Sequence, residues 1–424
     1  MYSNSSLLCW AEKYKMLVLF ILVLLIGVAV FKELIYLLPK FSWRIFTPWV
    51  VLVFLMATLT LLGIRIAQRH YGLESINGVH DGITQTEIAL SYLWQGTNPY
   101  SVDYFDTSLE EFRFYYNQVN PALYHYAYLP GVLVLGSPLY FISPFIIGFY
   151  DQRLTQALIF ALLIFWLVWR YRQNPKLILL VPLLFFNFWF MVYFLHGLND
   201  IVIIALVILA LEFVIIRKYL ASAIILGCAL ATKQTTWFVL PFLIQFFWHW
   251  EKLHFGTAKP EVRRRAIVWG GTALLVATII ILPFLIKDPQ GFWADTISYQ
   301  SGRVENSYPI MGIGMGEIIY QLGLVPERTS YFPFWIFQLI IAGLVGWYAW
   351  QYQKRRPIEP WLVLWLWTLL LTGVWFMNRY FSITHLAALI VMVCLTYFYK
   401  ELEQGERFKT KPWFSRLVAG IIKK

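Results

Sequence analysis

Charged residues are scarce in this chain of 424 residues. Asp, Glu, Lys and Arg make up 13% of it, against about 25% in ordinary soluble domains. So little charge cannot cover a water-exposed surface, which excludes a soluble enzyme and a disordered scaffold. Hydrophobic residues reach 59%, and several apolar runs are about 20 residues long, enough to cross a bilayer. The composition predicts an all-α polytopic membrane protein.

Cysteine is rare as well. Cys9, Cys228 and Cys394 lie far apart without metal-ligand spacing, which excludes a disulfide framework and argues against cysteine chemistry. The net charge of +11 does not indicate a nucleic-acid partner, because basic residues in a membrane protein mark its cytoplasmic loops. The run 16–38 is long for a signal peptide and no small-residue cleavage site follows it, so we expect an uncleaved span.

The apolar runs predict eleven transmembrane helices in a single domain over residues 1–424. They lie near 16–38, 48–67, 153–170, 177–195, 200–216, 220–234, 236–250, 266–286, 331–350, 360–377 and 383–399. The run 128–150 contains three prolines, each of which removes a backbone donor. We therefore expect an interfacial or half-inserted segment there.

Basic residues gather in one set of connections. Most Lys and Arg fall in the short connections after 170, 217, 251 and 354 and in the tail 400–424, whereas 68–152 and 287–330 hold more acidic than basic residues. The positive-inside rule makes the first set cytoplasmic, in the inner or plasma membrane if the source is bacterial. It also places the N-terminus outside. The two long connections then lie on the non-cytoplasmic face, where loop length indicates function.

Polar residues occur at the outer ends of the predicted spans. His80 and Asp81 stand between two glycines, which predicts a tight turn that presents the carboxylate before a helix carrying Glu87. The alternative is that Asp81 only caps that helix. Tyr100 closes a Gly-Thr-Asn-Pro-Tyr turn; it can reach a sugar or lipid, although such a turn is first of all structural.

A second polar group follows further along the chain. His196, Asn199 and Asp200 form a tight turn between two apolar spans, where polar groups are costly unless they have a function. The alternative is turn formation and helix capping. Lys233, beside Gln234, lies deep in an apolar stretch; it either snorkels outward or holds a phosphate as a point charge.

Two arginines on the same face complete the set. Arg303 lies in the second long connection and Arg379 precedes the last span; arginine forks suit phosphate recognition. For His385, one turn further on, packing against a neighbouring helix is favoured over the site. Carboxylates and cations beside the bilayer suit an anionic lipid-phosphate substrate and a base-assisted group transfer.

In this order, these residues resemble the GT-C superfamily of integral-membrane glycosyltransferases, which take a sugar from a polyprenyl- or dolichyl-phosphate donor. The closest similarity is to the glucosyltransferases that act on lipid-linked oligosaccharides and to bacterial mannosyltransferases. The resemblance covers roughly residues 70–250. It rests on Asp81, the turn Gly96–Tyr100, the aromatic-proline segment Tyr126–Pro130, the turn His196–Asp200 and the pair Lys233-Gln234. The chain departs from the superfamily in its second span before the Asp loop, in a single proline where many relatives have two, and in 287–330, which holds no motif that aligns.

The resemblance implies an inverting transfer of a hexose, with mannose favoured, to a lipid-linked or cell-surface glycan. Asp81 is the candidate base, with a pKa that we expect to be raised toward a useful range. Asp200 is the second catalytic candidate; it either orients the sugar or, with Asp81, binds a divalent cation (Mg²⁺ or Mn²⁺), which is useful but not required. Lys233, Arg379 and Arg303 would hold the donor phosphate. The other expected substrate contacts are His80, Glu87, Tyr100, His196, Asn199 and Gln234.

Other functions remain open. A flippase or transporter of a lipid-linked sugar is the main alternative, but transporters usually place polar sites near the bilayer midplane, often in two related halves. Here the charges lie at the outer rim, and the sequence has no evident repeat. A channel is disfavoured because no span has a polar stripe. A non-catalytic subunit could keep the same architecture, although Asp81, Asp200 and Lys233 are all present.

Overall fold

The computed structural model describes residues 43–73, 78–112, 119–174, 181, 188–256 and 258–410. The chain divides into two compact units, Met1–Thr47 and Pro48–Lys424, and only Trp43–Thr47 of the first unit are described. The predicted span 16–38, most of the predicted span 177–195 and the tail beyond Thr410 lie outside the described residues. The prediction of a single domain stays a prediction.

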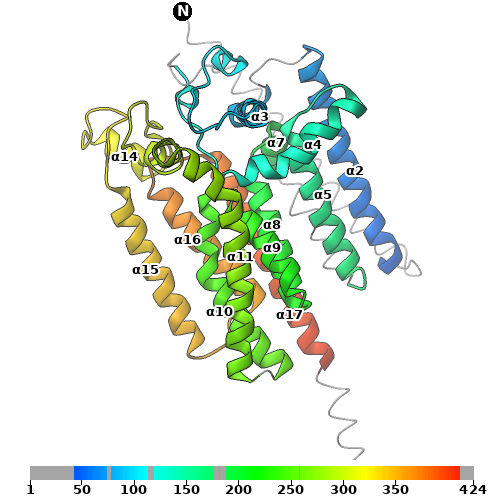
Figure 1. Cartoon of the computed structure of the whole chain (residues 1–424). Helices are drawn as coiled ribbons and strands as arrows, with labels where there is room; N and C mark the ends of the chain where they lie inside the picture. The colour runs from blue at the N-terminus through cyan, green and yellow to red at the C-terminus, as the bar shows by residue number, and fades with distance from the viewer. Residues whose placement is uncertain are drawn as a thin grey trace, which may run out of the picture. The chain divides into compact units, whose positions relative to one another are not determined.

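Helices make up almost all the described secondary structure, which confirms the all-α class (Figure 1). Within the described residues, five helices are long and apolar enough to cross a membrane: α2 (Trp43–His70), α5 (Gln152–Tyr171), α11 (Lys259–Lys287), α15 (Phe334–Gln353) and α17 (Ile383–Thr410). A sixth crossing is counted if α7 (Phe188–His196) and α8 (Asp200–Ile215), bent by 105° at their junction, form one span. The described part of the chain is thus that of an integral membrane protein, and the number eleven stays a prediction.

The described ranges also contain three shorter apolar helices: α4 (Gly131–Ile147), α9 (Tyr219–Leu230) and α16 (Pro360–Phe376). Helix α4 occupies the proline-rich run for which we expected no regular span. It begins directly after Pro130 and ends at Gly148, whose φ of 85° stops the helix. With 17 residues it falls short of the roughly 20 that cross a bilayer.

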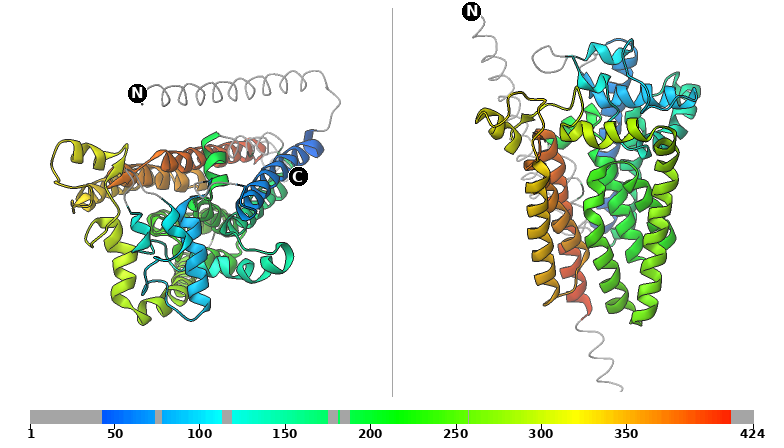
Figure 2. Two further views of the ribbon diagram at one scale, coloured as in Figure 1. Left: turned by 90° about the horizontal axis from the view of Figure 1, so that it is seen from above. Right: turned by 60° about the vertical axis from the view of Figure 1, so that its left-hand side comes forward.

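The long helices pack in two sets. Helix α9 packs against α8 and α11, and α5 packs against α8, whereas α16 packs between α15 and α17. In Figure 2 the orange and red helices of the second set stand side by side. Helix α8 is buried along nearly its whole length, because its sequence is apolar on every face. It forms the centre of the larger hydrophobic core.

Shorter elements gather at one end of these helices (Figure 1). They are α3 (Asp81–Trp94), the 3₁₀ segments Ser108–Glu111, Pro121–Leu123 and Gln234–Val239, α12 (Pro289–Trp293), a π-helical turn at Ala294–Ser298, α13 (Tyr299–Ser301) and α14 (Met315–Gln321). The 3₁₀ segment Gln234–Val239 leads into α10 (Leu240–Phe255), which packs against α11 and α16. Strand β1 (Met311–Gly312) pairs in parallel with β2 (Tyr380–Phe381). This short ladder joins the second long connection to the residues that precede α17.

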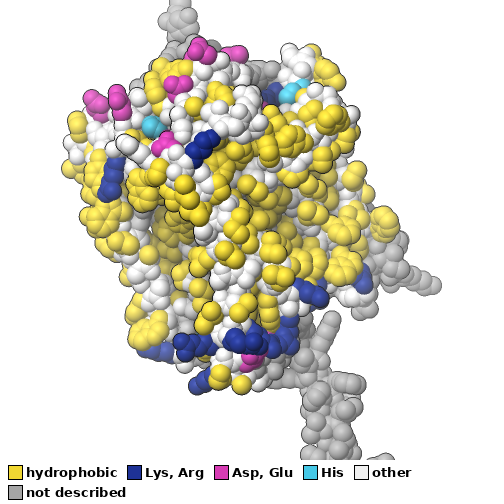
Figure 3. Space-filling view, in the orientation of Figure 1, with side chains coloured by type: hydrophobic (Ala, Val, Ile, Leu, Met, Phe, Trp, Pro, Cys, Tyr) yellow, Lys and Arg dark blue, Asp and Glu magenta, His cyan; other side chains and the backbone are white. Residues whose placement is uncertain are grey.

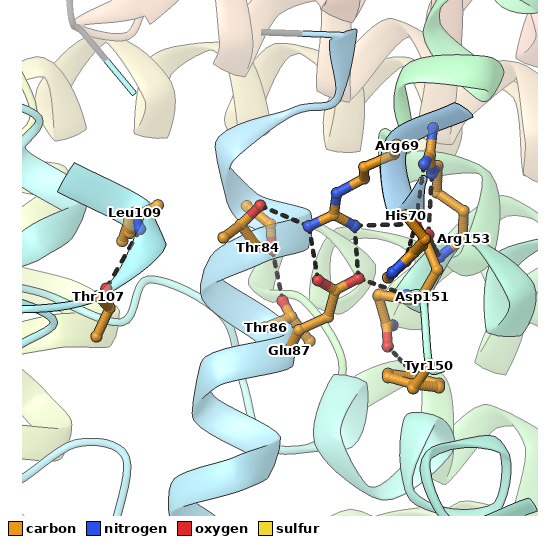
Figure 4. A network of polar contacts seen from close by, with 12 residues as sticks. Arg69, His70, Thr84, Thr86, Glu87, Thr107, Leu109, Tyr150, Asp151 and Arg153 are labelled. Carbon is orange, nitrogen blue, oxygen red and sulfur yellow. Dashed lines mark hydrogen bonds and ion pairs between the residues drawn. The ribbon is translucent and has the colours of Figure 1, made fainter. Parts of the chain in front are cut away.

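A buried ionic network fixes α3 to α2 and α5 (Figure 4). The guanidinium of Arg69 donates to both oxygens of Glu87, at 3.0 and 2.8 Å, and to Asp151 at 2.9 Å. Asp151 also receives two hydrogen bonds from Arg153, each of 2.9 Å. Two arginines thus balance two carboxylates, as buried charges require. Glu87, expected to contact substrate, belongs to this network instead.

Candidate functional site

A cavity of about 370 Å³ opens among the short elements. Its wall is formed by the start of α3, residues 122–128, the 3₁₀ segment after Lys233, residues 296–301 and the facing ends of α15, α16 and α17. Tyr, Trp and Phe side chains make up much of the lining, and a few charged and amide groups project among them. Concave sites with this composition are typical of small-molecule binding.

Asp81 lies in this wall at the first turn of α3. His80 caps the helix, with its Nδ1 2.9 Å from Asp81 Oδ1. The amide of Gly82 donates to Oδ1 of Asp81 at 2.7 Å, and Asn120 Nδ2 donates to Oδ2 at 2.9 Å. Tyr128 comes so close that a Cβ at position 82 would stand 2.2 Å from its phenol oxygen. Glycine is therefore required beside this carboxylate.

The contacts of Asp81 lower its pKa. Burial raises the pKa of Asp81, but the charge of His80 and hydrogen bonds from His80, Asn120 and Gly82 outweigh burial and bring the pKa to about 2. Burial lowers the pKa of His80, but the neighbouring carboxylate of Asp81 raises it by more, so the pKa of His80 is raised overall. The expected rise in the pKa of Asp81 is therefore wrong. Asp81 is an ionised carboxylate throughout the physiological pH range.

A second His–Asp pair lies in the same wall. His125 Nδ1 is 2.8 Å from Asp295 Oδ1, and its Nε2 is 3.0 Å from the carbonyl of Glu305. Since both ring nitrogens face acceptors, this geometry favours the imidazolium. Burial lowers the pKa of His125, but the bonds to Asp295 and Glu305 raise it overall. Gln85 Nε2 fixes the same segment by donating to the carbonyl of His125 at 2.7 Å.

Neither partner of this second pair was expected from the sequence. The two residues are 170 positions apart, and Asp295 lies in the long connection in which no motif aligns. It belongs to the π-helical turn Ala294–Ser298, a rare element that often occurs at functional sites. The one signal in the sequence was the rarity of histidine, of which the chain has seven.

Lys233 forms an ion pair that the sequence did not predict. Its Nζ lies 2.6 Å from Asp200 Oδ1 and 3.2 Å from Asn199 Oδ1. The bend between α7 and α8 positions Asn199 and Asp200 for this contact. Lys233 lines the cavity and keeps one N–H donor beyond these two bonds. Its positive charge, however, is balanced by Asp200.

Arg379 is another cation of the cavity wall, and no ion pair with a carboxylate is found for it among the described residues. It is 1% exposed and lines the cavity. Its Nη2 donates to three carbonyls, those of residues 328, 329 and 330. Its Nε and Nη1 have no hydrogen-bond partner in the described part of the chain. Burial lowers the pKa of Arg379 to about 10, which still leaves the guanidinium charged at neutral pH.

Gly302 makes this position possible. Its φ of +84° belongs to the left-handed region, and a Cβ there would stand 1.7 Å from Arg379 Nη1. The other cations of the cavity wall, His80, His125 and Lys233, each lie within 3 Å of a carboxylate. Among the described lining residues, Arg379 is thus a cation without a carboxylate at ion-pair distance. A guanidinium with unpaired donors is suited to binding an anion such as phosphate.

The other expected site residues are found in several places. Gln234 lines the cavity, with its Nε2 bonded to the carbonyl of Thr296 at 2.8 Å. His385, for which we favoured a position against a neighbouring helix, also lines it. Arg303 lies outside the lining, and its Nη2 donates to Tyr331 at 3.0 Å.

Two expected contacts serve structural roles. Tyr100 is buried in a smaller hydrophobic core and donates its phenol to the carbonyl of Tyr128 at 2.6 Å. His196 contributes its carbonyl, which accepts from the amide of His80 at 2.9 Å. That backbone bond joins the turns around His80 and His196, which the sequence placed on one face.

The expected cation site at Asp81 and Asp200 is poorly supported by its donors. Within the described ranges, no group of three or more His, Cys, Asp or Glu side chains is placed to hold a metal ion. Asp200 is engaged by Lys233, and Asp81 by His80 and Asn120. A divalent cation at Asp81 and Asp200 stays a prediction.

Comparisons with known proteins found similarity to solved structures but not to a known family. No protein-family model matches the chain, and no curated protein matches its sequence. The chain is similar to a crystal structure described as ArnT from Cupriavidus metallidurans bound to undecaprenyl phosphate. The identity is 16%, the TM-score is 0.47, and the similarity covers 83% of this chain. The chain spans 60% of the length of that protein.

Proposed function

We propose that this protein is a GT-C glycosyltransferase that transfers a sugar from a polyprenyl-phosphate donor to an acceptor hydroxyl. The observation that carries the proposal is Arg379, a buried guanidinium whose Nε and Nη1 are unpaired, in the wall of a cavity that also presents the ionised Asp81. The guanidinium of Arg379 suits a phosphate group, and the carboxylate of Asp81 suits a reacting hydroxyl.

Each residue has a role in the proposed reaction. The acceptor hydroxyl donates a hydrogen bond to Asp81, and its oxygen attacks the anomeric carbon as the bond from that carbon to the phosphate oxygen breaks. The hydroxyl proton passes to Asp81. Because a carboxylate with a pKa of about 2 is a weak base, this transfer comes late, when the attacking oxygen has become acidic. Arg379, with the remaining donor of Lys233, stabilises the charge on the departing polyprenyl phosphate.

The finer assignment rests on the resemblance in the sequence. We propose an inverting transfer of a hexose, with mannose favoured, to a lipid-linked or cell-surface glycan on the non-cytoplasmic face. Support for the face comes from the charge distribution. Figure 3 shows most of the visible Lys and Arg along the end of the helices remote from the short elements, and most of the visible Asp and Glu at the opposite end, where a few basic side chains also lie. The positive-inside rule makes the basic end cytoplasmic.

Transfer assays test the proposal directly. Purified full-length protein in nanodiscs is given a panel of radiolabelled polyprenyl-phosphate sugars, with membrane lipid extract as acceptor. We expect Asp81→Asn to lower turnover at least a hundredfold, with donor binding intact. Asp103→Asn, a change of the same chemistry at an exposed residue, should leave turnover unchanged. Absence of transfer from every donor, with intact binding, would favour a flippase or a non-catalytic subunit.

Donor binding tests the anion site separately. Arg379→Gln removes the charge and should weaken binding of the donor at least tenfold, and Arg379→Lys should restore part of it. The matched control is Arg303→Gln, since Arg303 does not line the cavity, although its Nη2 donates to Tyr331, which does. Equal losses in the two glutamine variants would contradict the assignment of the phosphate to Arg379.

A further inference from the structure

A second cavity lies between helices α9 and α11, at their ends remote from the first one. It measures about 210 Å³ and is lined by Tyr219, Leu220 and Ala223 of α9 and by residues from Arg264 to Thr272 of α11. Both helices run from this end toward the first cavity, since Lys233 follows α9 and Lys287 ends α11. The two cavities are thus at opposite ends of the same pair of helices.

The helix contact explains why a groove forms here. At Gly227 the two helices approach so closely that a Cβ would stand 2.6 Å from the carbonyl of Ala273. About one turn toward the basic end, Trp269 Nε1 donates to Ser222 Oγ at 3.0 Å and forms the floor. The neighbouring lining residue Ala223 has a small side chain, so a groove remains between the two helices.

The rim of the groove carries a surplus of positive charge. Arg265 lies between Glu251 and Glu261, at 2.9 and 2.8 Å, and Arg217 is 3.3 Å from Glu251. Arg264 also contacts Glu261, at 3.0 Å. The stretch 251–265 that borders the rim holds five basic residues (Lys252, Lys259, Arg263, Arg264 and Arg265) against two acidic ones (Glu251 and Glu261), so this end of the groove carries a surplus of positive charge. The side chain of Arg264 is 74% exposed, so this charge is accessible at the rim.

The sides of the groove are apolar and face outward. Leu220 is 68% and Val268 62% exposed, and both lie on helices whose exposed surface is hydrophobic and suited to lipid contact. Figure 3 shows the row of Lys and Arg at this end, directly below a yellow apolar surface. Basic pockets between membrane helices bind the headgroups of anionic lipids, and an acyl chain fits an apolar groove that continues from them.

We propose that this groove binds an anionic phospholipid, with the phosphate at Arg264 and one acyl chain between Leu220 and Val268. The net charge at the rim favours a headgroup with a net negative charge over a zwitterionic one. This site is separate from the cavity of Asp81 and Arg379, and the proposal is independent of the proposed sugar transfer.

Native mass spectrometry of the full chain tests this proposal. Detergent-solubilised protein is titrated with phosphatidylglycerol or with phosphatidylcholine of the same acyl chains. We expect tighter retention of phosphatidylglycerol, and about fivefold weaker binding after Arg264→Gln. Arg172→Gln serves as the control, because the guanidinium of Arg172 packs on Trp169 instead. Equal retention of both lipids, or equal effects of the two variants, would overturn the proposal.

Two further measurements separate the parts of the lipid. Val268→Trp fills the groove without changing charge, and it should reduce phosphatidylglycerol binding as strongly as the loss of Arg264. Inorganic phosphate should compete weakly, because it lacks the acyl chain. Full competition by phosphate at millimolar concentration, or normal binding in the tryptophan variant, would show a simple anion site and refute the lipid assignment. The thermal unfolding temperature of each variant confirms that it is folded.

Discussion

Asn120 offers the sharpest test of Asp81 as the proton acceptor. Its Nδ2 donates to Asp81 Oδ2 at 2.9 Å, and its Oδ1 accepts from the amide of Ala122 at 3.0 Å. Asn120→Asp keeps the second bond and places a carboxylate against Asp81 in place of a donor. The substitution therefore alters the charge beside Asp81 while the local turn retains its cap.

The size of the effect follows from these contacts. Asp81 has a pKa of about 2 against an ordinary 3.8, a difference of roughly 2.5 kcal/mol. Loss of a hydrogen bond to a charged group costs about 1.5 kcal/mol, or about one pKa unit. Repulsion between two carboxylates adds about two units more. We expect the pair formed by Asn120→Asp to titrate with an apparent pKa near 5.

The assay is the pH dependence of kcat/KM for sugar transfer between pH 4 and 8. Wild type should show no acid limb, because Asp81 stays ionised over this range. The Asn120→Asp variant should lose activity below about pH 5, whereas the profile of Asn120→Ala should stay flat, because loss of the hydrogen bond alone leaves the pKa of Asp81 below this pH range. Asn174→Asp, at the opposite end of α5 from Asp151, controls for the added charge. A flat profile in Asn120→Asp, with a normal unfolding temperature, would refute proton transfer to Asp81.

Two more predictions concern the wall of the cavity. Gly302→Ala should weaken donor binding at least tenfold, because its Cβ would displace the Arg379 guanidinium. The control Gly323→Ala, at a φ of +70° with open space around it, should carry only the backbone strain. Equal donor affinities in the two variants would argue against the anion site. The raised pKa of His125 means that its ion pair with Asp295 stabilises the fold below the unfolded pKa of about 6.5. This contribution is lost as pH rises through the folded pKa. The thermal unfolding temperature of wild type should therefore fall over that interval more than that of His125→Gln. Parallel curves of unfolding temperature against pH would contradict the pairing.

Much of the fold could be predicted from the sequence. The apolar runs around α2, α5, α11, α15 and α17 are long and poor in charge, so each specifies a helix without help from its neighbours. The break before Asp200 was signalled by Gly197, which adopts a φ of +91°, and by the polar residues around it. The number of crossings could not be fixed, since short apolar helices such as α9 and α16 depend on packing partners for their position.

The site was predictable only where one local segment carries the signal. Asp81 is presented by its own turn, so the sequence indicated it. Its low pKa was not predictable, because Asn120 lies 39 residues further on. The same holds for the pairing of Lys233 with Asp200 and for the unpaired donors of Arg379. These properties depend on contacts between distant segments, which composition and spacing do not encode.

The network of Figure 4 also has a consequence for how the protein is made. Arg69 leaves the ribosome before both of its partners, since Glu87 follows it by 18 residues and Asp151 by 82. An unpaired arginine is costly within a bilayer, so α2 cannot settle at its final depth until α3 and the start of α5 have been synthesised. We therefore expect a cysteine placed at Gln68 to be labelled by a water-soluble maleimide more readily in nascent chains that stop before Asp151 than in chains that extend past α5. The ionic network would then complete the positioning of α2 only after the start of α5 has been synthesised.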